Sequence, residues 1–135
     1  MVIVMVRRYL CRCGATLTVT PAETRHGRLY TASAIGAALA LFGVKRLPAR
    51  TVRAAISPWR VVGVAASTGW VTLRRWISAV RARVLFTGAV PSTPADFTAR
   101  QVAERAAMAL AAHAPPDAGG PGIIERVFEG VTLVS

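Results

Sequence analysis

The sequence predicts a mainly α-helical protein, in which a short N-terminal β-hairpin precedes a helical bundle that contains a helix-turn-helix. Two β-prone runs flank a glycine-containing turn near the start of the chain, which is typical of a hairpin. Helix-capping residues then alternate with apolar residues at helical spacing as far as residue 113. The 135 residues suffice for one small domain with an appendage. We expect four segments: the hairpin at 1–28, the helical domain at 29–87, a linker with an amphipathic helix at 88–113, and a flexible tail at 114–135.

The predicted hairpin carries both cysteines of the chain, Cys11 and Cys13, in its turn. A structural zinc site takes four ligands, which zinc ribbons supply from two cysteine knuckles. This chain has no second cysteine pair, and His26 is the nearest other ligand. Three interpretations stay open: a degenerate knuckle with two free thiols, zinc bound together with His26 or a partner chain, and redox chemistry. Zinc is the one cofactor that the sequence suggests.

The first predicted helix is the most apolar stretch of the chain. Thr31 or Ser33 caps its start, it runs through Phe42, and Gly43 is its expected stop. Because its apolar residues cover nearly the whole circumference, we expect it to be the buried central helix. The apolar run at 30–44 is shorter than the roughly 20 residues that cross a bilayer, so we expect no integral membrane insertion.

Two short helices are predicted next, each introduced by a proline in its first turn. The first follows Pro48 and ends near residue 56, with three residues facing inward: Val52, Ala55 and Ile56. The motif Ser57-Pro58 starts the second, which runs to about residue 66. Together with the helix that follows, they give the order of a helix-turn-helix, in which the last helix enters the major groove of DNA.

The longest amphipathic pattern of the chain spans residues 70–84, with Thr68 as its expected N-cap. Six residues form its apolar stripe: Trp70, Leu73, Trp76, Ile77, Val80 and Val84. Arginines flank and oppose this stripe. We interpret the tryptophans, Trp59 included, as core residues rather than as platforms for base stacking.

A linker is predicted at residues 88–94, because it holds glycine and two prolines. Thr93 and Asp96 are spaced like a capping box, so we expect a helix from Pro94 to His113. Its expected inward residues are Phe97, Val102, Ala106, Ala109 and Leu110. Residues 114–122 read as a flexible linker, and 123–134 as either a docked strand or a frayed tail.

Charge divides the chain into two parts. Residues 1–90 carry fourteen Lys or Arg and a single acid, Glu23, whereas residues 91–135 carry three Arg and five acids. A basic block of this kind attracts polyanions, meaning nucleic acid or an anionic membrane surface. We predict that nucleic acid contacts ten residues: Arg46, Arg50, Arg53, Arg60, Thr72, Arg74, Arg75, Ser78, Arg81 and Arg83.

Several stretches together resemble a group of uncharacterised bacterial transposase-like proteins that pair a zinc-ribbon start with a helix-turn-helix. They are Arg-Arg-Tyr-Leu-Cys-Arg-Cys-Gly-Ala-Thr-Leu-Thr-Val from Arg7, Leu-Tyr-Thr-Ala-Ser-Ala-Ile-Gly-Ala-Ala-Leu-Ala-Leu-Phe-Gly from Leu29, Ser-Pro-Trp-Arg-Val-Val-Gly from Ser57, and Gly-Trp-Val-Thr-Leu-Arg-Arg-Trp from Gly69. The resemblance covers roughly residues 6–86. It implies DNA binding by the helix of Arg74 and Arg75, and zinc at the cysteine knuckle. The family has Cys-x-x-Cys and an earlier cysteine pair, so this chain resembles an N-terminally truncated member.

No catalytic activity is expected. Transposases hold two metal ions with clustered carboxylates, whereas the six acids here are scattered: Glu23, Asp96, Glu104, Asp117, Glu125 and Glu129. We therefore predict a DNA-binding protein, sequence-specific or general, that resembles the DNA-binding part of a transposase. The alternatives are a basic helical protein on a membrane surface or a protein partner, and a non-functional product of a truncated mobile element.

The expected location is the cytoplasm, in association with the nucleoid. The start of the chain has its charges after the apolar run, which is the reverse of a signal peptide. The expected partner is DNA, with a second copy of the chain as a further candidate.

Overall fold

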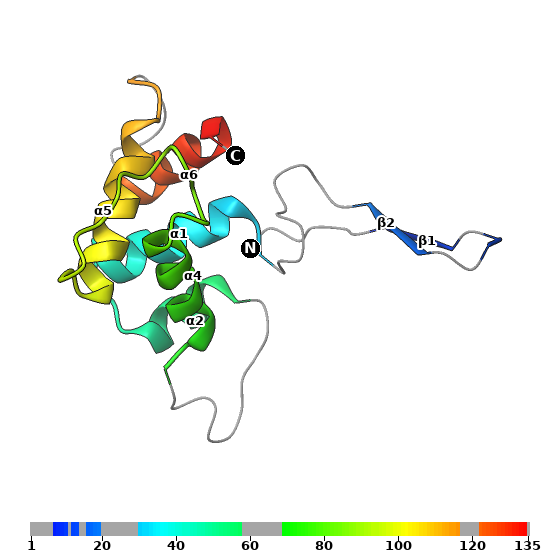
Figure 1. Cartoon of the computed structure of the whole chain (residues 1–135), viewed down its shortest axis with the longest axis horizontal. Coiled ribbons are helices and arrows are strands. Elements are labelled where there is room, and N and C mark those ends of the chain that lie inside the picture. The colour runs from blue at the N-terminus through cyan, green and yellow to red at the C-terminus, as the bar shows by residue number, and fades with distance from the viewer. Residues whose placement is uncertain are drawn as a thin grey trace.

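A computed structural model describes residues 7–10, 12–13, 16–19, 30–57, 69–116 and 122–134. The described helices are α1 (Ala32–Gly43), α2 (Ala49–Ile56), α4 (Val71–Arg81), α5 (Ala99–Ala112) and α6 (Ile123–Val134) (Figure 1). Strands β1 (Arg7–Leu10) and β2 (Thr16–Val19) pair antiparallel, with Arg7 opposite Val19 and Leu10 opposite Thr16. The prediction of a mainly helical protein is confirmed.

Helix α1 lies at the centre of the bundle, as its composition predicted. The Ala34 N–H donates to Thr31 Oγ1 at 3.1 Å, which satisfies one of the N–H groups that the first turn leaves free. Ile35 and Leu39 are fully buried, and α1 packs against α2, α4, α5 and α6. None of the described helices is long and apolar enough to cross a membrane.

Helix α1 ends at Gly43, one residue beyond the predicted last residue Phe42, but Gly43 does not adopt the left-handed conformation of a C-terminal stop. Val44 is the C-cap. A Cβ at Gly43 would overlap the backbone of Ala103 and Glu104 in α5. The glycine is therefore required by the close crossing of α1 and α5 rather than by the end of the helix.

Residues 123–134 form helix α6, so both predictions for this segment, a strand or a frayed tail, are wrong. Val127 and Val131 are buried against α1, where a Cβ on Gly36 would come within 2.9 Å of each of their side chains. Gly130 lies directly against the carbonyl oxygen of Leu110 in α5. Close backbone contact with two helices thus docks α6 on the bundle.

Helix α5 begins later than predicted. Thr98 is its N-cap: the Gln101 N–H donates to Thr98 Oγ1 at 3.3 Å, and the Thr98 N–H donates to Gln101 Oε1 at 2.8 Å. This reciprocal capping box replaces the predicted one at Thr93 and Asp96, which lie before the helix. The predicted end holds, since His113 is the C-cap. Three of the predicted inward residues of the helix are buried, namely Val102, Ala106 and Leu110, while Phe97 and Ala109 are half-buried.

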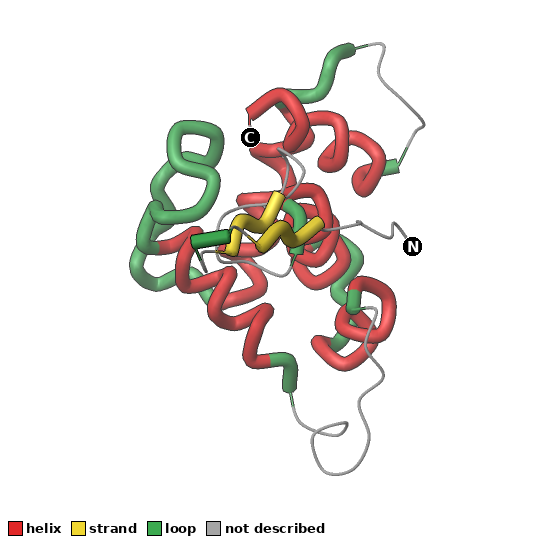
Figure 2. Tube along the Cα trace, turned by 90° about the vertical axis from the view of Figure 1, so that its right-hand side faces the viewer, coloured by secondary structure: helices red, strands yellow, loops and turns green. Residues whose placement is uncertain are grey.

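The connection between α4 and α5, which includes the predicted linker at residues 88–94, packs on the core. Leu85, Phe86 and Val90 are buried, and His113 Nε2 lies 3.2 Å from the Ala89 carbonyl oxygen. This connection is the long green segment at the edge of the helices in Figure 2.

Helix α2 follows its prediction in part. Pro48 is the N-cap rather than the first helical residue. Val52 is fully buried and Ile56 half-buried, but Ala55 is exposed. Val52 and Ile56 are four residues apart, so they define a narrow inner stripe that leaves Ala55 at its edge. The predicted second short helix, with Trp59 and Arg60, lies outside the described residues.

Candidate nucleic-acid interface

Helix α4 buries the apolar stripe that the sequence predicted. Five of its six members are buried: Trp70, Leu73, Trp76, Ile77 and Val80. Val84 is 66% exposed, because the helix ends at Arg81 and the chain turns away. The N-cap is Trp70, which makes no side-chain capping bond, and not the predicted Thr68, which lies outside the described residues. The opposite face of α4 therefore points to solvent.

Three aromatic rings fix the start of α4. Tyr30, Trp70 and Trp76 contact one another edge to face, with ring centroids 5.1 to 5.8 Å apart. Edge-to-face pairs are directional, so they orient a helix as well as burying surface. The Tyr30 hydroxyl also donates to Ser57 Oγ at 3.2 Å, at the end of α2. Tyr30 just before the N-cap of α1, the end of α2 and the start of α4 meet at this cluster, and Trp70 and Trp76 are core residues, as predicted.

The end of α4 is a Schellman motif built on an arginine. Arg83 has a φ of 57°, in the left-handed region. The Arg83 N–H donates to the Val80 carbonyl oxygen at 3.0 Å, and the Val84 N–H to that of Ala79 at 2.9 Å. These are the two bonds that satisfy the last carbonyls of a helix in this motif, where glycine is the usual residue. The motif explains why the helix is shorter than its apolar pattern.

Arg81 has a structural role that its sequence position did not reveal. Its two terminal nitrogens donate to the Ala95 carbonyl oxygen at 3.1 Å and to the Phe97 carbonyl oxygen at 2.6 Å. The guanidinium thus ties the end of α4 to the segment that leads into α5. Arg81 was predicted to contact nucleic acid, but its fork already binds the protein.

Arg100 is a second structural arginine, and nothing in the sequence pattern indicated it. Its Nη1 donates to the Phe42 carbonyl oxygen near the end of α1, and its guanidinium lies 4.2 Å from the centroid of the Phe42 ring. A cation at this position satisfies a free carbonyl and complements the negative end of the helix dipole. Arg100 therefore fastens α5 to the C-terminus of α1.

Most of the other predicted residues that the structure describes are open to solvent. Arg46, Arg50, Arg74, Arg75, Ser78 and Arg83 are exposed, and Arg53 and Thr72 are half-buried. Within the described residues, the guanidinium groups of Arg74 and Arg75 have no hydrogen-bonding or ion-pair partner in the protein, in contrast to Arg81 and Arg100. The predicted contact Arg60 lies outside the described residues. We call the exposed side chains of Arg74, Arg75 and Ser78 the α4 face.

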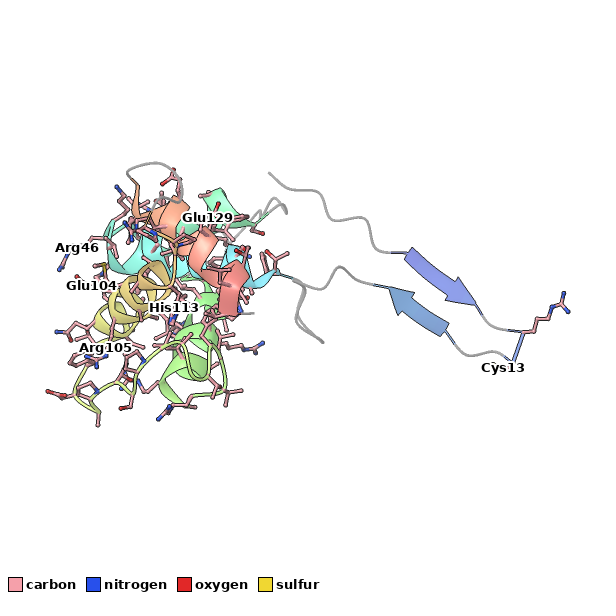
Figure 3. All side chains as sticks on the ribbon, turned by 90° about the horizontal axis from the view of Figure 1, so that it is seen from above. Cys13, Arg46, Glu104, Arg105, His113 and Glu129 are labelled. Atoms are coloured by element: carbon pink, nitrogen blue, oxygen red, sulfur yellow. The ribbon has the colours of Figure 1, made fainter. Side chains whose placement is uncertain are left out.

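Charge is distributed over the described helices in the way that the sequence predicted for the chain. Residues 30–57 and 69–95 hold eight Lys or Arg and no carboxylate. The acids of the described part are Asp96, Glu104, Glu125 and Glu129, in and just before α5 and α6. Figure 3 shows Glu104 on α5 and Glu129 on α6. The positive charge of α2 and α4 is therefore not neutralised by carboxylates of those helices.

The described residues test the metal prediction only at Cys13, which is exposed in the turn between β1 and β2. Cys11 and His26 lie outside the described residues. No group of three or more His, Cys, Asp or Glu side chains that could hold a metal ion occurs in the part of the chain that the structure describes. Zinc at the cysteines stays a prediction.

Comparisons with protein-family models, with curated proteins and with solved structures find no match to this chain. The resemblance to transposase-like proteins therefore also stays a prediction.

Proposed function

We propose that the protein binds duplex or single-stranded DNA through the α4 face, as a binding module without catalytic activity. The observation that carries the proposal is an oriented helix with a buried apolar side, whose opposite side presents two arginines that have no partner within the described residues. A cation without an internal counter-ion remains available to a phosphate.

The chemistry of the α4 face suits DNA. Arg74 and Arg75 are adjacent on a helix of 11 residues, which is about 16 Å long. Guanidinium groups bind phosphates or the O6 and N7 atoms of guanine in a bidentate manner, and the Ser78 hydroxyl can bond to a base or a phosphate. The number of such contacts that reach base edges decides whether binding is sequence-specific or general.

Binding to a membrane surface is a weaker proposal. An interfacial helix inserts its apolar side between lipid chains. The apolar side of α4 is buried in the protein core, with Leu73 and Trp76 no more than 3% exposed. Membrane insertion of α4 would require this core to open, whereas phosphate binding uses the side of the helix that already faces solvent.

DNA binding over a series of salt concentrations tests the proposal. Replacing Arg74 and Arg75 together by Gln, a good helix former, removes both charges without breaking the helix. We expect affinity to fall and the slope of log K against log salt to become shallower by about 0.9 for each lost phosphate contact on duplex DNA. Arg105→Gln is the matched control, since this exposed arginine lies on α5 among the acidic residues.

If the double variant and the Arg105→Gln control bind DNA with equal affinity and equal salt slope, the DNA contact lies outside the α4 face. Absence of binding by the wild-type chain at low salt would refute DNA binding altogether. Binding to anionic vesicles that exceeds binding to DNA would favour the membrane alternative. A location at the nucleoid and a DNA-bound second copy are further parts of the proposal, which microscopy and sedimentation of the complex test.

A further inference from the structure

We infer that Arg46 and Arg83 are backbone-phosphate ligands, which occupy left-handed turn positions at the ends of α1 and α4 where glycine would serve the fold better. This inference rests on the proposed function, and it names two anchor points in addition to the α4 face. Arg46 and Arg83 both have a φ of 57°, a backbone conformation that is strained for residues other than glycine.

Both arginines stand at the same kind of place. Arg83 is the left-handed residue of the Schellman motif after α4. Arg46 reverses the chain after α1, where the Lys45 N–H donates to the Ala40 carbonyl oxygen and the Leu47 N–H to that of Leu41, each at 3.0 Å. In both turns the backbone bonds depend on the left-handed conformation and not on the side chain. The fold therefore has no use for a long side chain at either position.

In Phe86, by contrast, burial of the side chain compensates for the strained backbone. It is the third described residue other than glycine with positive φ, at 56°, and its ring is 1% exposed in the core. Burial of a large apolar ring offsets the strained backbone. Arg46 and Arg83 are exposed, and within the described residues their guanidinium groups bond to no protein acceptor. Nothing inside the protein offsets the strain through these side chains.

The helix dipole is the remaining internal reason for a cation at these positions. A positive charge near a helix C-terminus is favourable. However, the Arg100 guanidinium already binds the Phe42 carbonyl oxygen at the end of α1, and Arg81 lies in the last turn of α4. Since a cation is present at each end without Arg46 and Arg83, the dipole does not explain a second one in a strained position. A phosphate of bound DNA is the partner that accounts for a guanidinium at both positions.

The experiment replaces each arginine by glycine in the full chain, singly and together, and measures thermal unfolding and affinity for a duplex of arbitrary sequence over a salt series. Arg→Gly relieves the backbone and removes the guanidinium in one step. We expect an unfolding midpoint equal to or above that of the wild type. Affinity should fall on the order of tenfold for the double variant, with a salt slope shallower by about 1.8, or 0.9 for each contact. Arg→Lys at both positions should restore most of the slope.

Each other outcome has a definite meaning. If the wild-type chain binds DNA and the double glycine variant binds with unchanged affinity and slope, the two side chains are not phosphate ligands, while the proposed function stands. A midpoint well below that of the wild type would show that the arginines serve the fold, which also overturns the inference. If the wild-type chain binds no DNA, the proposed function fails, and this inference fails with it.

Discussion

Gly130 in α6 offers the sharpest test of how the helices pack. A Cβ built there would overlap the Leu110 carbonyl oxygen and come within 2.8 Å of the Leu110 carbonyl carbon. These are backbone atoms of α5, so they cannot rotate away as the end of a side chain can. Gly130→Ala must therefore move α6 bodily away from α5. The move also loosens Val127 and Val131, which are fully buried beside it.

The size of the effect follows from two opposing contributions. In an exposed helix the exchange of Gly for Ala stabilises by up to about 1 kcal/mol. Overpacking against an immovable neighbour costs about 1–3 kcal/mol, and loosened contacts of two buried valines add to this cost. We expect a net loss of about 2 kcal/mol, which for a domain of this size lowers the unfolding midpoint by roughly 6–10 °C.

Thermal unfolding followed by far-ultraviolet circular dichroism measures this change. Gly69→Ala is the matched control, because a Cβ at Gly69 meets nothing within 4 Å. Its midpoint should stay close to that of the wild type, since a surface substitution usually changes stability by less than about 0.5 kcal/mol. If Gly130→Ala instead raises the midpoint, as in an exposed helix, then α6 does not contact α5 at this residue.

Two further predictions concern polar contacts. Arg81→Ala should destabilise the fold by about 1–2 kcal/mol, because the Ala95 and Phe97 carbonyl oxygens lose their donors. Urea unfolding measures the change. If Arg81→Ala is as stable as Arg75→Ala, these hydrogen bonds do not hold the connection between α4 and α5. Thr98→Ala should lower the free energy of unfolding by about 1 kcal/mol, because α5 loses its N-cap. Thr93→Ala should lower it by less, since Thr93 does not cap the helix, and urea unfolding compares the two variants.

Sequence patterns predicted the features that depend on one helix alone. The cap at Thr31 and the buried stripe from Trp70 to Val80 involve neighbours within one or two turns, so their spacing carries the information. The end of α5 at His113 was also accessible, because the prolines after it cannot continue a helix. Each of these expectations agrees with the structure to within a residue or two.

Features that depend on two segments were missed. Gly43 was predicted only as the end of α1, whereas its close contact with Glu104 in α5, far along the chain, was not foreseen. The sequence around Gly130 read as a strand or a tail, because β-branched residues and glycine lower helix propensity, while contact with α1 and α5 stabilises the helix. The cap of α5 was predicted at Thr93 and not at Thr98, although Thr98 and Gln101 fit the S/T-x-x-E/Q pattern of a capping box, which Thr93 and Asp96 only approximate.

The difference between contacts within one helix and contacts between two segments also decides how much of the candidate interface the sequence could reveal. Periodicity placed Arg75 opposite the apolar stripe and both Arg74 and Arg81 beside it, so nothing local separates Arg74 from Arg81. The carbonyl acceptors of Arg81 are 14 and 16 residues further on, so only the fold shows that this guanidinium is occupied. A basic helix thus has a smaller binding capacity than its charge suggests, because arginines that fasten the fold are unavailable to phosphate. The salt slope counts the available ones directly, and it should report the contacts of Arg74 and Arg75 but not one from Arg81.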